Sequence, residues 1–218
     1  IDPMTVDNIF DFFRGYDNTY MTLSDSVPDE IRFYTDPISG KVYNSQGAVE
    51  GARPVLNSQT GFTEFTNDQM LATNPVSQYG ADQDFEFCLI FKIDNLINLN
   101  YMFTSTINSN NRFAIGMRDG NIGFGHYTGS FKTKGVAFSD TSNTHVLWGK
   151  KSGNIYSGTL DGNQLALDNI SLASTTVVSS SMGDSANSAS SIKLRFAKSG
   201  SFTNAEKAGI EKWINENL

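Results

Sequence analysis

Asp84-Phe85-Glu86-Phe87-Cys88-Leu89-Ile90-Phe91 carries a large apolar side chain at every second position. Successive side chains of a β-strand point to opposite faces, so Phe85, Phe87, Leu89 and Phe91 would share one face of a strand. In a helix the same four positions would be spread around the axis. The segment therefore predicts a strand in the core of a β-sandwich, with its aromatic face turned inward.

Seven further segments have the length and composition of strands. Each is rich in β-branched or aromatic residues and is bounded by residues that favour turns. They are 31–34, 61–65, 113–117, 121–125, 145–150, 154–160 and 192–196. Asp119-Gly120 and Asp161-Gly162 lie between such segments, and both dipeptides favour the positive φ angles of two-residue hairpin turns. Repeated hairpins predict antiparallel sheets, and hence an all-β sandwich.

The first apolar segment predicts a short helix near the amino terminus. Val6, Ile9, Phe10 and Phe13 recur at helical spacing, and Gly15 can adopt the left-handed conformation that ends a helix. We expect this helix to dock on the sandwich or on a neighbouring chain.

The closing segment predicts an amphipathic helix. Thr203-Asn204-Ala205-Glu206 matches a capping box, in which the first and last side chains bond to each other's backbone N–H groups. Ile210, Trp213, Ile214 and Leu218 then form one apolar stripe. We expect this stripe to pack against the sandwich, with Trp213 among the best buried residues of the helix.

The chain is predicted to form a single sandwich domain. A length of 218 residues is within the range of one all-β domain. Residues 1–16 are interpreted as a cloning remnant, Ile1-Asp2-Pro3, followed by the helical segment, and residues 17–218 as the sandwich. The interval 171–191 is rich in Ser, Thr, Ala and Asn with a short strand candidate at Thr175–Val178, which predicts an edge strand followed by a surface loop.

Composition argues against several classes of partner. The formal net charge of −7 disfavours nucleic acid and anionic membrane surfaces, because both require a clustered basic face. No apolar run approaches the roughly 20 residues that cross a bilayer, so membrane insertion is not expected. Cys88 is the single cysteine, which excludes an internal disulfide, and we expect it to be an inert strand residue.

Four groups of residues occur in an order that is typical of one family. They are Asp36-Pro37-Ile38-Ser39-Gly40 with Arg53-Pro54-Val55-Leu56, Phe62-Thr63-Glu64-Phe65 with the strand at 85–91, His145-Val146-Leu147 with Tyr156 and Leu160-Asp161-Gly162, and Phe202-Thr203-Asn204-Ala205-Glu206 with Ile210-Glu211-Lys212-Trp213-Ile214. Over about 36–218 the chain thereby resembles the concanavalin A-like, laminin-G-like domains. The resemblance implies a jelly roll, an antiparallel β-sandwich with the closing helix packed on it.

The resemblance also implies a function. Domains of this family include lectins, carbohydrate-binding modules, adhesion modules and glycoside hydrolases, and they are common in phage tail and baseplate proteins and in bacterial surface proteins. We therefore expect a non-catalytic, lectin-like module that binds a cell-surface saccharide, on a virion or outside the cell, within a larger multivalent assembly. Two alternatives stay open: a glycoside hydrolase with the same sandwich, and a structural module for protein–protein adhesion.

Polar loop residues beside aromatic rings are the candidates for sugar recognition. A pyranose presents apolar C–H faces and hydroxyl edges, so its site combines an aromatic ring with hydrogen-bonding side chains. The predicted glycan-binding residues are Tyr127, His126, Asn110, Asn111, Arg112, Tyr101 and Arg118, with Tyr79 as a further stacking candidate. The alternative is that Asn and Asp here serve only hairpin turns. Because the domain is acidic, neutral hydroxyl-rich glycans fit it better than polyanions.

One strand carries three alternating carboxylates, Asp82, Asp84 and Glu86. This pattern resembles the carboxylate strand of glycoside hydrolases with the same sandwich, in which retaining hydrolysis needs two carboxyl groups about 5–5.5 Å apart. We interpret the three acids instead as the solvated face opposite the Phe stripe. No catalytic residue is predicted, and the domain is expected not to be an enzyme.

No metal or other cofactor is predicted. His126 and His145 are the two histidines, and neither has a second His or Cys at metal-ligand spacing. Calcium stays open, because loop Asp, Asn and carbonyl oxygens suit it and because members of the resembled family use it.

Overall fold

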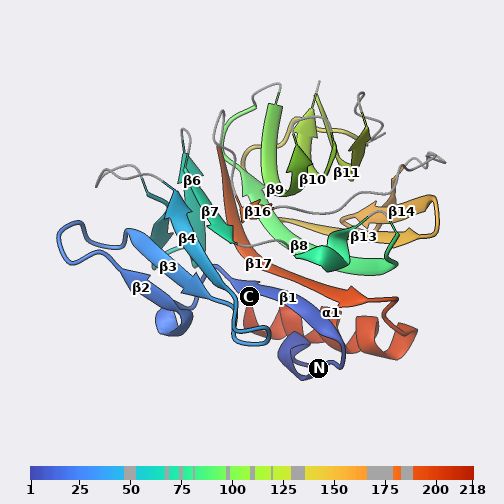
Figure 1. The fold of residues 1–218 in the computed structure, drawn as a ribbon, viewed down its shortest axis with the longest axis horizontal. Coiled ribbons are helices and arrows are strands. Elements are labelled where there is room, and N and C mark those ends of the chain that lie inside the picture. Colours follow the sequence, from blue (N-terminus) through green and yellow to red (C-terminus); the bar gives the residue numbers. More distant parts are fainter. Residues whose placement is uncertain are drawn as a thin grey trace.

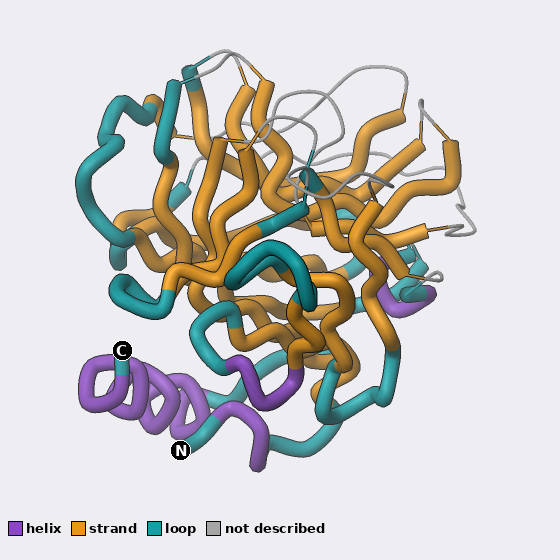
Figure 2. The backbone as a smooth tube through the Cα atoms, turned by 90° about the vertical axis from the view of Figure 1, so that its left-hand side faces the viewer, coloured by secondary structure: helices purple, strands orange, loops and turns teal. Residues whose placement is uncertain are grey.

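The computed structural model describes residues 1–46, 53–66, 69–73, 76–80, 82–96, 99–108, 111–118, 120–128, 136–165, 179–182 and 189–218. Within these residues, antiparallel strands form two sheets that pack face to face, and one α-helix lies outside them (Figure 1 and Figure 2). The prediction of an all-β sandwich is therefore confirmed. No helix in the described part of the chain is long and apolar enough to cross a membrane.

The first sheet, sheet A, has the strand order β15-β14-β13-β8-β17-β6-β5, and β1 also pairs with β17. Its strands are β1 (Ile9–Arg14), β5 (Val55–Asn57), β6 (Phe62–Thr66), β8 (Phe85–Ile93), β13 (His145–Ser152), β14 (Ile155–Leu160), β15 (Asn163–Gln164) and β17 (Ala189–Ser199). Five of the predicted strands are confirmed here, as β6, β8, β13, β14 and β17. The long strands β8 and β17 lie side by side at the centre of the sheet.

The second sheet, sheet B, has the order β12-β11-β10-β9-β16-β7-β4-β3-β2. Its strands are β2 (Met21–Leu23), β3 (Ile31–Thr35), β4 (Val42–Gln46), β7 (Met70–Thr73), β9 (Leu99–Asn108), β10 (Asn111–Arg118), β11 (Asn121–Thr128), β12 (Val136–Ala137) and β16 (Ser179–Met182). The predicted strands at 31–34, 113–117 and 121–125 are confirmed as β3, β10 and β11. Short 3-10 helices occupy Pro3–Thr5, Asn18–Tyr20 and Ser77–Tyr79.

The edge strand predicted at 175–178 lies outside the described residues, whereas part of the stretch predicted as a surface loop after it is a strand. Residues 179–182 form β16, which pairs with β7 on one side and with β9 on the other. It is therefore an interior strand, and its position follows from long-range pairing that the local composition does not encode. Residues 171–178 and 183–188 lie outside the described residues.

The main core lies between the two sheets. The predicted stripe of β8 is confirmed, because Phe85, Phe87, Leu89 and Phe91 are all fully buried. These side chains meet the aromatic side chains of sheet B edge-on, and the ring centroids of Phe87 and Phe124 are 4.9 Å apart. Aromatic pairs in this geometry stabilise a core beyond their area burial.

A second apolar layer lies between the outer face of sheet A and the helix α1 (Asn204–Asn217), which runs beneath β17 in Figure 1. The predicted capping box is present, since Thr203 and Glu206 exchange both hydrogen bonds. Ile210 and Ile214 are the buried residues of α1. They pack in one cluster with Cys88, which is buried as the prediction of an inert strand residue requires.

The prediction that Trp213 is among the best buried residues of α1 is wrong. Its ring is only partly buried and packs at the margin of the second layer, where the Arg14 guanidinium lies 5.6 Å from the ring centre. The apolar contact of α1 is centred on Ile210 and Ile214, which are four residues apart and pack against sheet A. Trp213 therefore lies on the flank of the contact.

The prediction of an amino-terminal helix is also wrong. Ile9, Phe10 and Phe13 lie in strand β1, which pairs antiparallel with β17 and so belongs to the sandwich. Phe10 and Phe13 enter the main core, whereas Ile9 and Phe12 enter the layer beneath α1. Because both faces of β1 are buried, four of its six residues are apolar, and a short run of this kind cannot be told from a buried helix by periodicity.

Candidate binding groove

Two adjoining pockets lie between α1 and the outer face of strands β13 to β15. Their volumes are about 200 and 330 Å³, and Trp148 and Thr159 line both of them. The first also contains Glu86, Lys150, Ser157, Gln164 and Lys207. The second also contains Val146, Asp161, Glu211, Ile214 and Asn215. We call the pair the α1 groove; the larger pocket reaches the roughly 300 Å³ at which small-molecule sites begin.

Trp148 forms the aromatic wall shared by the two pockets. Alternation along β13 turns Leu147 into the main core and Trp148 toward α1. The Trp148 side chain is held edge-on by Phe196 and Phe202, with ring centroids 5.8 and 5.6 Å away, and only 7% of the residue is exposed. The groove therefore presents a fixed indole edge rather than a mobile ring.

Two opposed glycines shape the floor of the groove. Gly149 on β13 faces Gly158 on β14 across the hairpin. A Cβ on Gly149 would lie 2.3 Å from the Phe87 ring, and one on Gly158 would lie 2.4 Å from the Trp148 carbonyl oxygen. Such distances are far inside van der Waals contact, so only glycine lets the hairpin approach the core this closely.

One end of the groove is lined by charged side chains around Glu86. Its Oε2 accepts a hydrogen bond from the Phe202 backbone N–H at 2.8 Å, and its Oε1 forms an ion pair with Lys207. Glu86 is only 2% exposed, so the interpretation of it as part of a solvated face is wrong. The segment that enters α1 folds over this strand and covers it. Asp82 and Asp84 are exposed, in agreement with that interpretation.

The opposite end of the groove carries Asp161, Glu211 and Asn215. The Asp161 carboxylate is fixed, because Oδ1 accepts from the Val146 N–H at 2.8 Å and Oδ2 lies 2.7 Å from Nδ1 of His145. His145 is buried at the start of β13, so the contact ties the turn after β14 to that strand. This end of the groove thus presents one carboxylate in a fixed position.

The predicted site residue His126 is a core residue. Its Nε2 lies 3.0 Å from the Tyr79 carbonyl oxygen, so Nε2 donates there and Nδ1 accepts from the Tyr156 hydroxyl. Burial lowers the pKa of His126 to about 4, and the residue is 3% exposed. It cannot contact a sugar in this conformation, and the same holds for the fully buried Tyr79.

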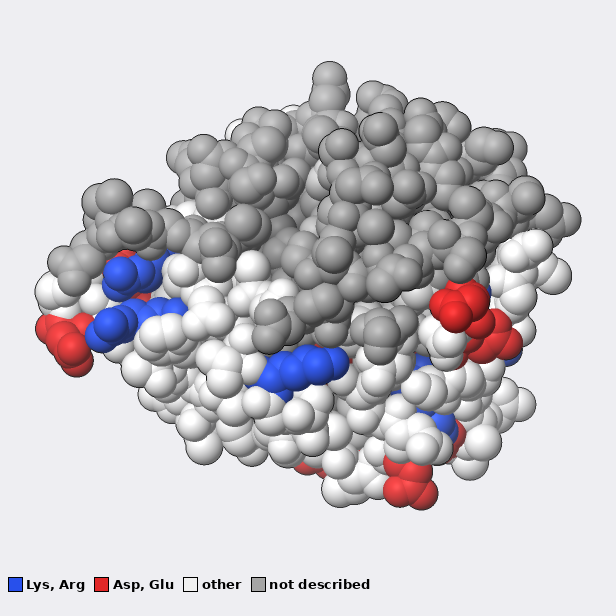
Figure 3. Space-filling view, in the orientation of Figure 1, with Lys and Arg blue, Asp and Glu red and all other residues white. Residues whose placement is uncertain are grey.

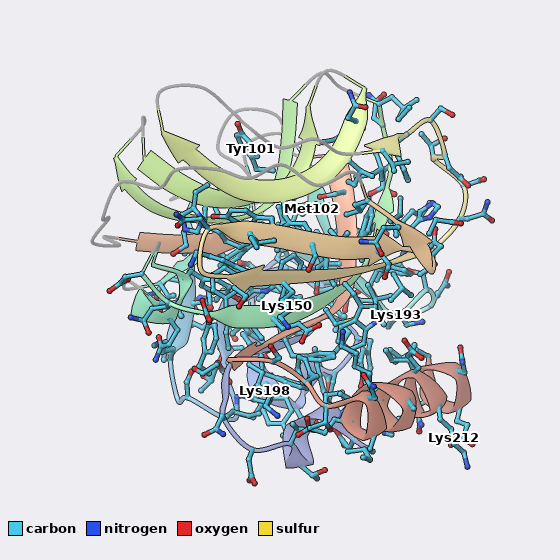
Figure 4. The ribbon with its side chains drawn as sticks, turned by 90° about the vertical axis from the view of Figure 1, so that its right-hand side faces the viewer. Tyr101, Met102, Lys150, Lys193, Lys198 and Lys212 are labelled. Carbon is cyan, nitrogen blue, oxygen red and sulfur yellow. The ribbon has the colours of Figure 1, made fainter. Side chains whose placement is uncertain are left out.

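The other predicted residues lie on or beside sheet B. Tyr101 and Met102 project to opposite sides of this sheet (Figure 4), and Tyr101 is 2% exposed, so its ring is not presented for stacking. Arg112 and Tyr127 are directly opposed in the backbone register of β10 and β11. Their neighbours Phe113 and His126 belong to the core face, so positions 112 and 127 belong to the outer face.

Two further predicted residues lie at the two ends of β10. Asn111 begins β10 and pairs with Thr128, and Arg118 ends the same strand opposite Asn121. Asn110 lies outside the described residues. Among the residues that are described, no group of three or more His, Cys, Asp or Glu side chains could hold a metal ion.

Sequence reasoning misses the α1 groove because its two walls are far apart in the chain. The signal that exists is the alternation of Leu147, Trp148 and Gly149, which places a large aromatic residue opposite the core face. The burial of His126 could also have been predicted from the sequence. Ile122, Phe124 and His126 alternate, which predicts that all three share the core face.

Comparison with protein-family models gives no match, and comparison with curated proteins gives none either. Several solved structures share the fold. A Trypanosoma rangeli sialidase in complex with sialic acid matches 93% of this chain at 11% identity, with a TM-score of 0.62. The binding domain of botulinum neurotoxin serotype D matches 97% at 13% identity and a TM-score of 0.60. The receptor-binding domain of a mosaic serotype C/D neurotoxin matches 97% at 14% identity and a TM-score of 0.59.

The likeness covers only part of each matched protein. The chain spans 32% of the sialidase chain and 53% and 52% of the two neurotoxin chains. At these identities the likeness shows a shared fold. The expectation that this domain is not an enzyme is contradicted, because sialidases, which are enzymes, are among the matched structures.

Proposed function

We propose that this chain is a concanavalin A-like domain that binds a saccharide in the α1 groove. The observation that carries the proposal is the composition of the groove: the fixed edge of Trp148 lies between hydrogen-bonding side chains that converge from β14, β15 and α1. Thr159, Gln164 and Asn215 supply neutral donors and acceptors. An aromatic side chain flanked by hydrogen-bonding groups is the combination that suits a pyranose.

The fold supports the same class of ligand. The matched structures include a sialidase in complex with sialic acid and two toxin domains described as binding or receptor-binding domains. A chain that includes this arrangement of strands thus occurs in complex with sialic acid. The groove supplies the argument for this chain, because a fold alone does not specify a function.

The affinity of one site is expected to be low. A groove with one aromatic edge and a few hydrogen bonds gives a Kd on the order of 0.1–1 mM, which corresponds to roughly 4–5.5 kcal/mol. Useful avidity then requires several copies in one assembly. We propose such a multivalent setting, outside the cell or on a virion surface as in phage tail adhesion, as the context of the domain.

The outer face of sheet B is a second candidate surface for the same function. Arg112 and Tyr127 stand opposite each other there in the strand register, and Asn111 is adjacent. The backbone register thus keeps these predicted positions next to one another. A variant of Tyr127 therefore belongs in the test.

A glycan array followed by titration tests the proposal. Thr159 lines both pockets, so Thr159→Tyr should fill the groove and weaken binding at least tenfold. Thr35→Tyr, on an exposed position of β3 in sheet B, is the matched control and should bind normally. The bound glycans are also assayed for release of reducing ends, which separates turnover from binding.

Two outcomes would overturn the proposal. If no glycan binds at millimolar concentration, the saccharide-binding function is wrong. If Tyr127→Ala abolishes binding while Thr159→Tyr retains it, the function stands but the groove is not its site.

A further inference from the structure

The charges along the α1 groove indicate which class of sugar it accepts. Resting on the proposed function, we propose that the bound saccharide carries a single carboxylate, held at the end of the groove where Lys150 and Lys207 lie. A uronic acid or another carboxylated sugar has this chemistry. The inference replaces the expectation of a neutral glycan that the overall acidity of the chain suggested.

Three lysines surround the buried carboxylate of Glu86. Lys150 on β13 and Lys198 on β17 are its direct cross-strand neighbours, and Lys207 approaches from α1. Glu206 is the second carboxylate of this cluster, with an Oε1 that lies 2.6 Å from Nζ of Lys198. Three positive and two negative charges leave one positive charge.

That remaining charge belongs to Lys150. Lys207 is paired with Glu86, and Lys198 with Glu206. The described residues contain no ion-pair partner for Lys150, which lines the groove beside Trp148 and Ser157. In Figure 4, Lys150 and Lys198 lie on the body of the sandwich, whereas Lys212 projects outward from α1. An ammonium group without a partner next to a pocket is suited to an anionic ligand group.

The other end of the groove limits the ligand to one negative charge. Asp161 and Glu211 line the second pocket, where they would repel a second anionic group but can accept hydrogen bonds from sugar hydroxyls. The net charge of −7 adds a general repulsion to polyanions. Among the described residues coloured on the face drawn in Figure 3, the basic side chains form small separate groups rather than one continuous path for a polyanion.

The ligand is therefore expected to lie in a fixed direction. Its carboxylate would be placed near Nζ of Lys150, its ring against the Trp148 edge, and its hydroxyls toward Asp161 and Asn215. Lys207 contributes to the same end, because its Nζ lies 5.4 Å from the centre of the Trp148 ring. A charge-assisted contact of this kind strengthens at low salt.

The experiment is a titration of the full chain with matched glycan pairs. Each pair consists of a uronic-acid-containing or sialylated oligosaccharide and its neutral counterpart, and a sulfated counterpart is included. We expect the carboxylated member to bind at least tenfold more tightly than the neutral one. Lys150→Gln should remove this preference, whereas Lys212→Gln, which changes a 75% exposed lysine on α1, should leave it unchanged.

The possible outcomes separate this inference from the proposed function. Equal binding of neutral and carboxylated glycans, or an unchanged preference in Lys150→Gln, would overturn the carboxylate assignment while saccharide binding stands. Preferential binding of the sulfated glycans would overturn it as well. Failure of every glycan to bind would overturn the proposed function itself. A circular dichroism spectrum of each variant that matches the parent verifies that folding is retained.

Discussion

Arg195 and Asp11 form an ion pair inside the sandwich, with Nη2 of Arg195 2.9 Å from Oδ1 of Asp11 and neither side chain exposed. The hydroxyls of Tyr43 and Tyr79 donate to the same carboxylate at 2.8 and 2.6 Å. The Arg195 guanidinium carbon also lies 3.9 Å from the centre of the Phe103 ring. This cluster joins β1 and β17 of sheet A to residues of sheet B. It is thus a polar link between the first and last strands of the chain.

Removal of Asp11 should destabilise the fold strongly. Asp11→Ala leaves a buried guanidinium and two buried hydroxyls without their acceptor, a change that costs about 3–5 kcal/mol. The matched control is Asp25→Ala, because the Asp25 side chain is 96% exposed and pairs with Arg32 at 3.5 Å. An exposed pair of this kind contributes about 0–1 kcal/mol. Urea unfolding measures both, and similar losses in the two variants would contradict the assignment.

The hairpin β13–β14 should tolerate no side chain at Gly149. Gly149→Ala places a methyl group 2.3 Å from the Phe87 ring, so the core must shift. Overpacking of a core costs about 1–3 kcal/mol. Gly153→Asn in the same hairpin is the control, because Gly153 has φ +55 with open space around it, and Asn adopts this conformation readily. Equal unfolding midpoints for the two variants would show that the hairpin has room.

The capping box of α1 should contribute to stability in a pH-dependent way. The bond to Lys198, followed by those to Thr203, lowers the pKa of Glu206 below its ordinary value. The contribution of Glu206 is therefore present above the pKa of the unfolded chain and is lost as the pH falls through the lower folded value. Glu206→Gln should lower the thermal midpoint at pH 7 and lose less on acidification than the parent. Identical slopes between pH 6 and 3 would contradict this.

The parts of the fold that follow from the sequence are set by short-range patterns. Phe85, Phe87 and Leu89 reveal their strand because alternation is a property of neighbouring residues. The start of α1 is equally local, since Thr203 and Glu206 bond across a single turn. These elements require no knowledge of the partner strand or sheet.

The parts that the sequence does not reveal depend on distant partners. The sequence of β1 looks helical because both faces of the strand are apolar. Phe12 packs in the layer beneath α1 and Phe13 packs in the main core, so the segments that bury the two faces are distant in the sequence. The α1 groove likewise exists only after Trp148 and Ile214 are brought together. Of the predicted site, the register brings Arg112 and Tyr127 together. His126 is next to Tyr127 in β11 and therefore faces the core, because adjacent positions of a strand face opposite sides.

His126 gives the sandwich a second acid-sensitive point. The neutral imidazole donates from Nε2 to the Tyr79 carbonyl and accepts the Tyr156 hydroxyl at Nδ1, and protonation removes the acceptor. Burial holds its pKa at about 4, whereas a histidine in the unfolded chain has a pKa of about 6.5. Between these two values the unfolded chain binds more protons than the folded one.

Acidification should therefore destabilise the protein through His126 over a defined interval. Stability is unaffected by this residue above pH ~6.5, falls as the pH decreases toward 4, and falls no further below it; the total loss is about 3 kcal/mol. In His126→Gln, an amide keeps one donor and one acceptor but does not titrate, so its urea midpoint should change less between pH 6.5 and 4. Because the other titratable groups are the same in both proteins, the difference between the two curves isolates His126. Parallel curves across this interval would show that His126 is protonated at the same pH in the folded and unfolded chains, and NMR titration of its imidazole would verify this directly.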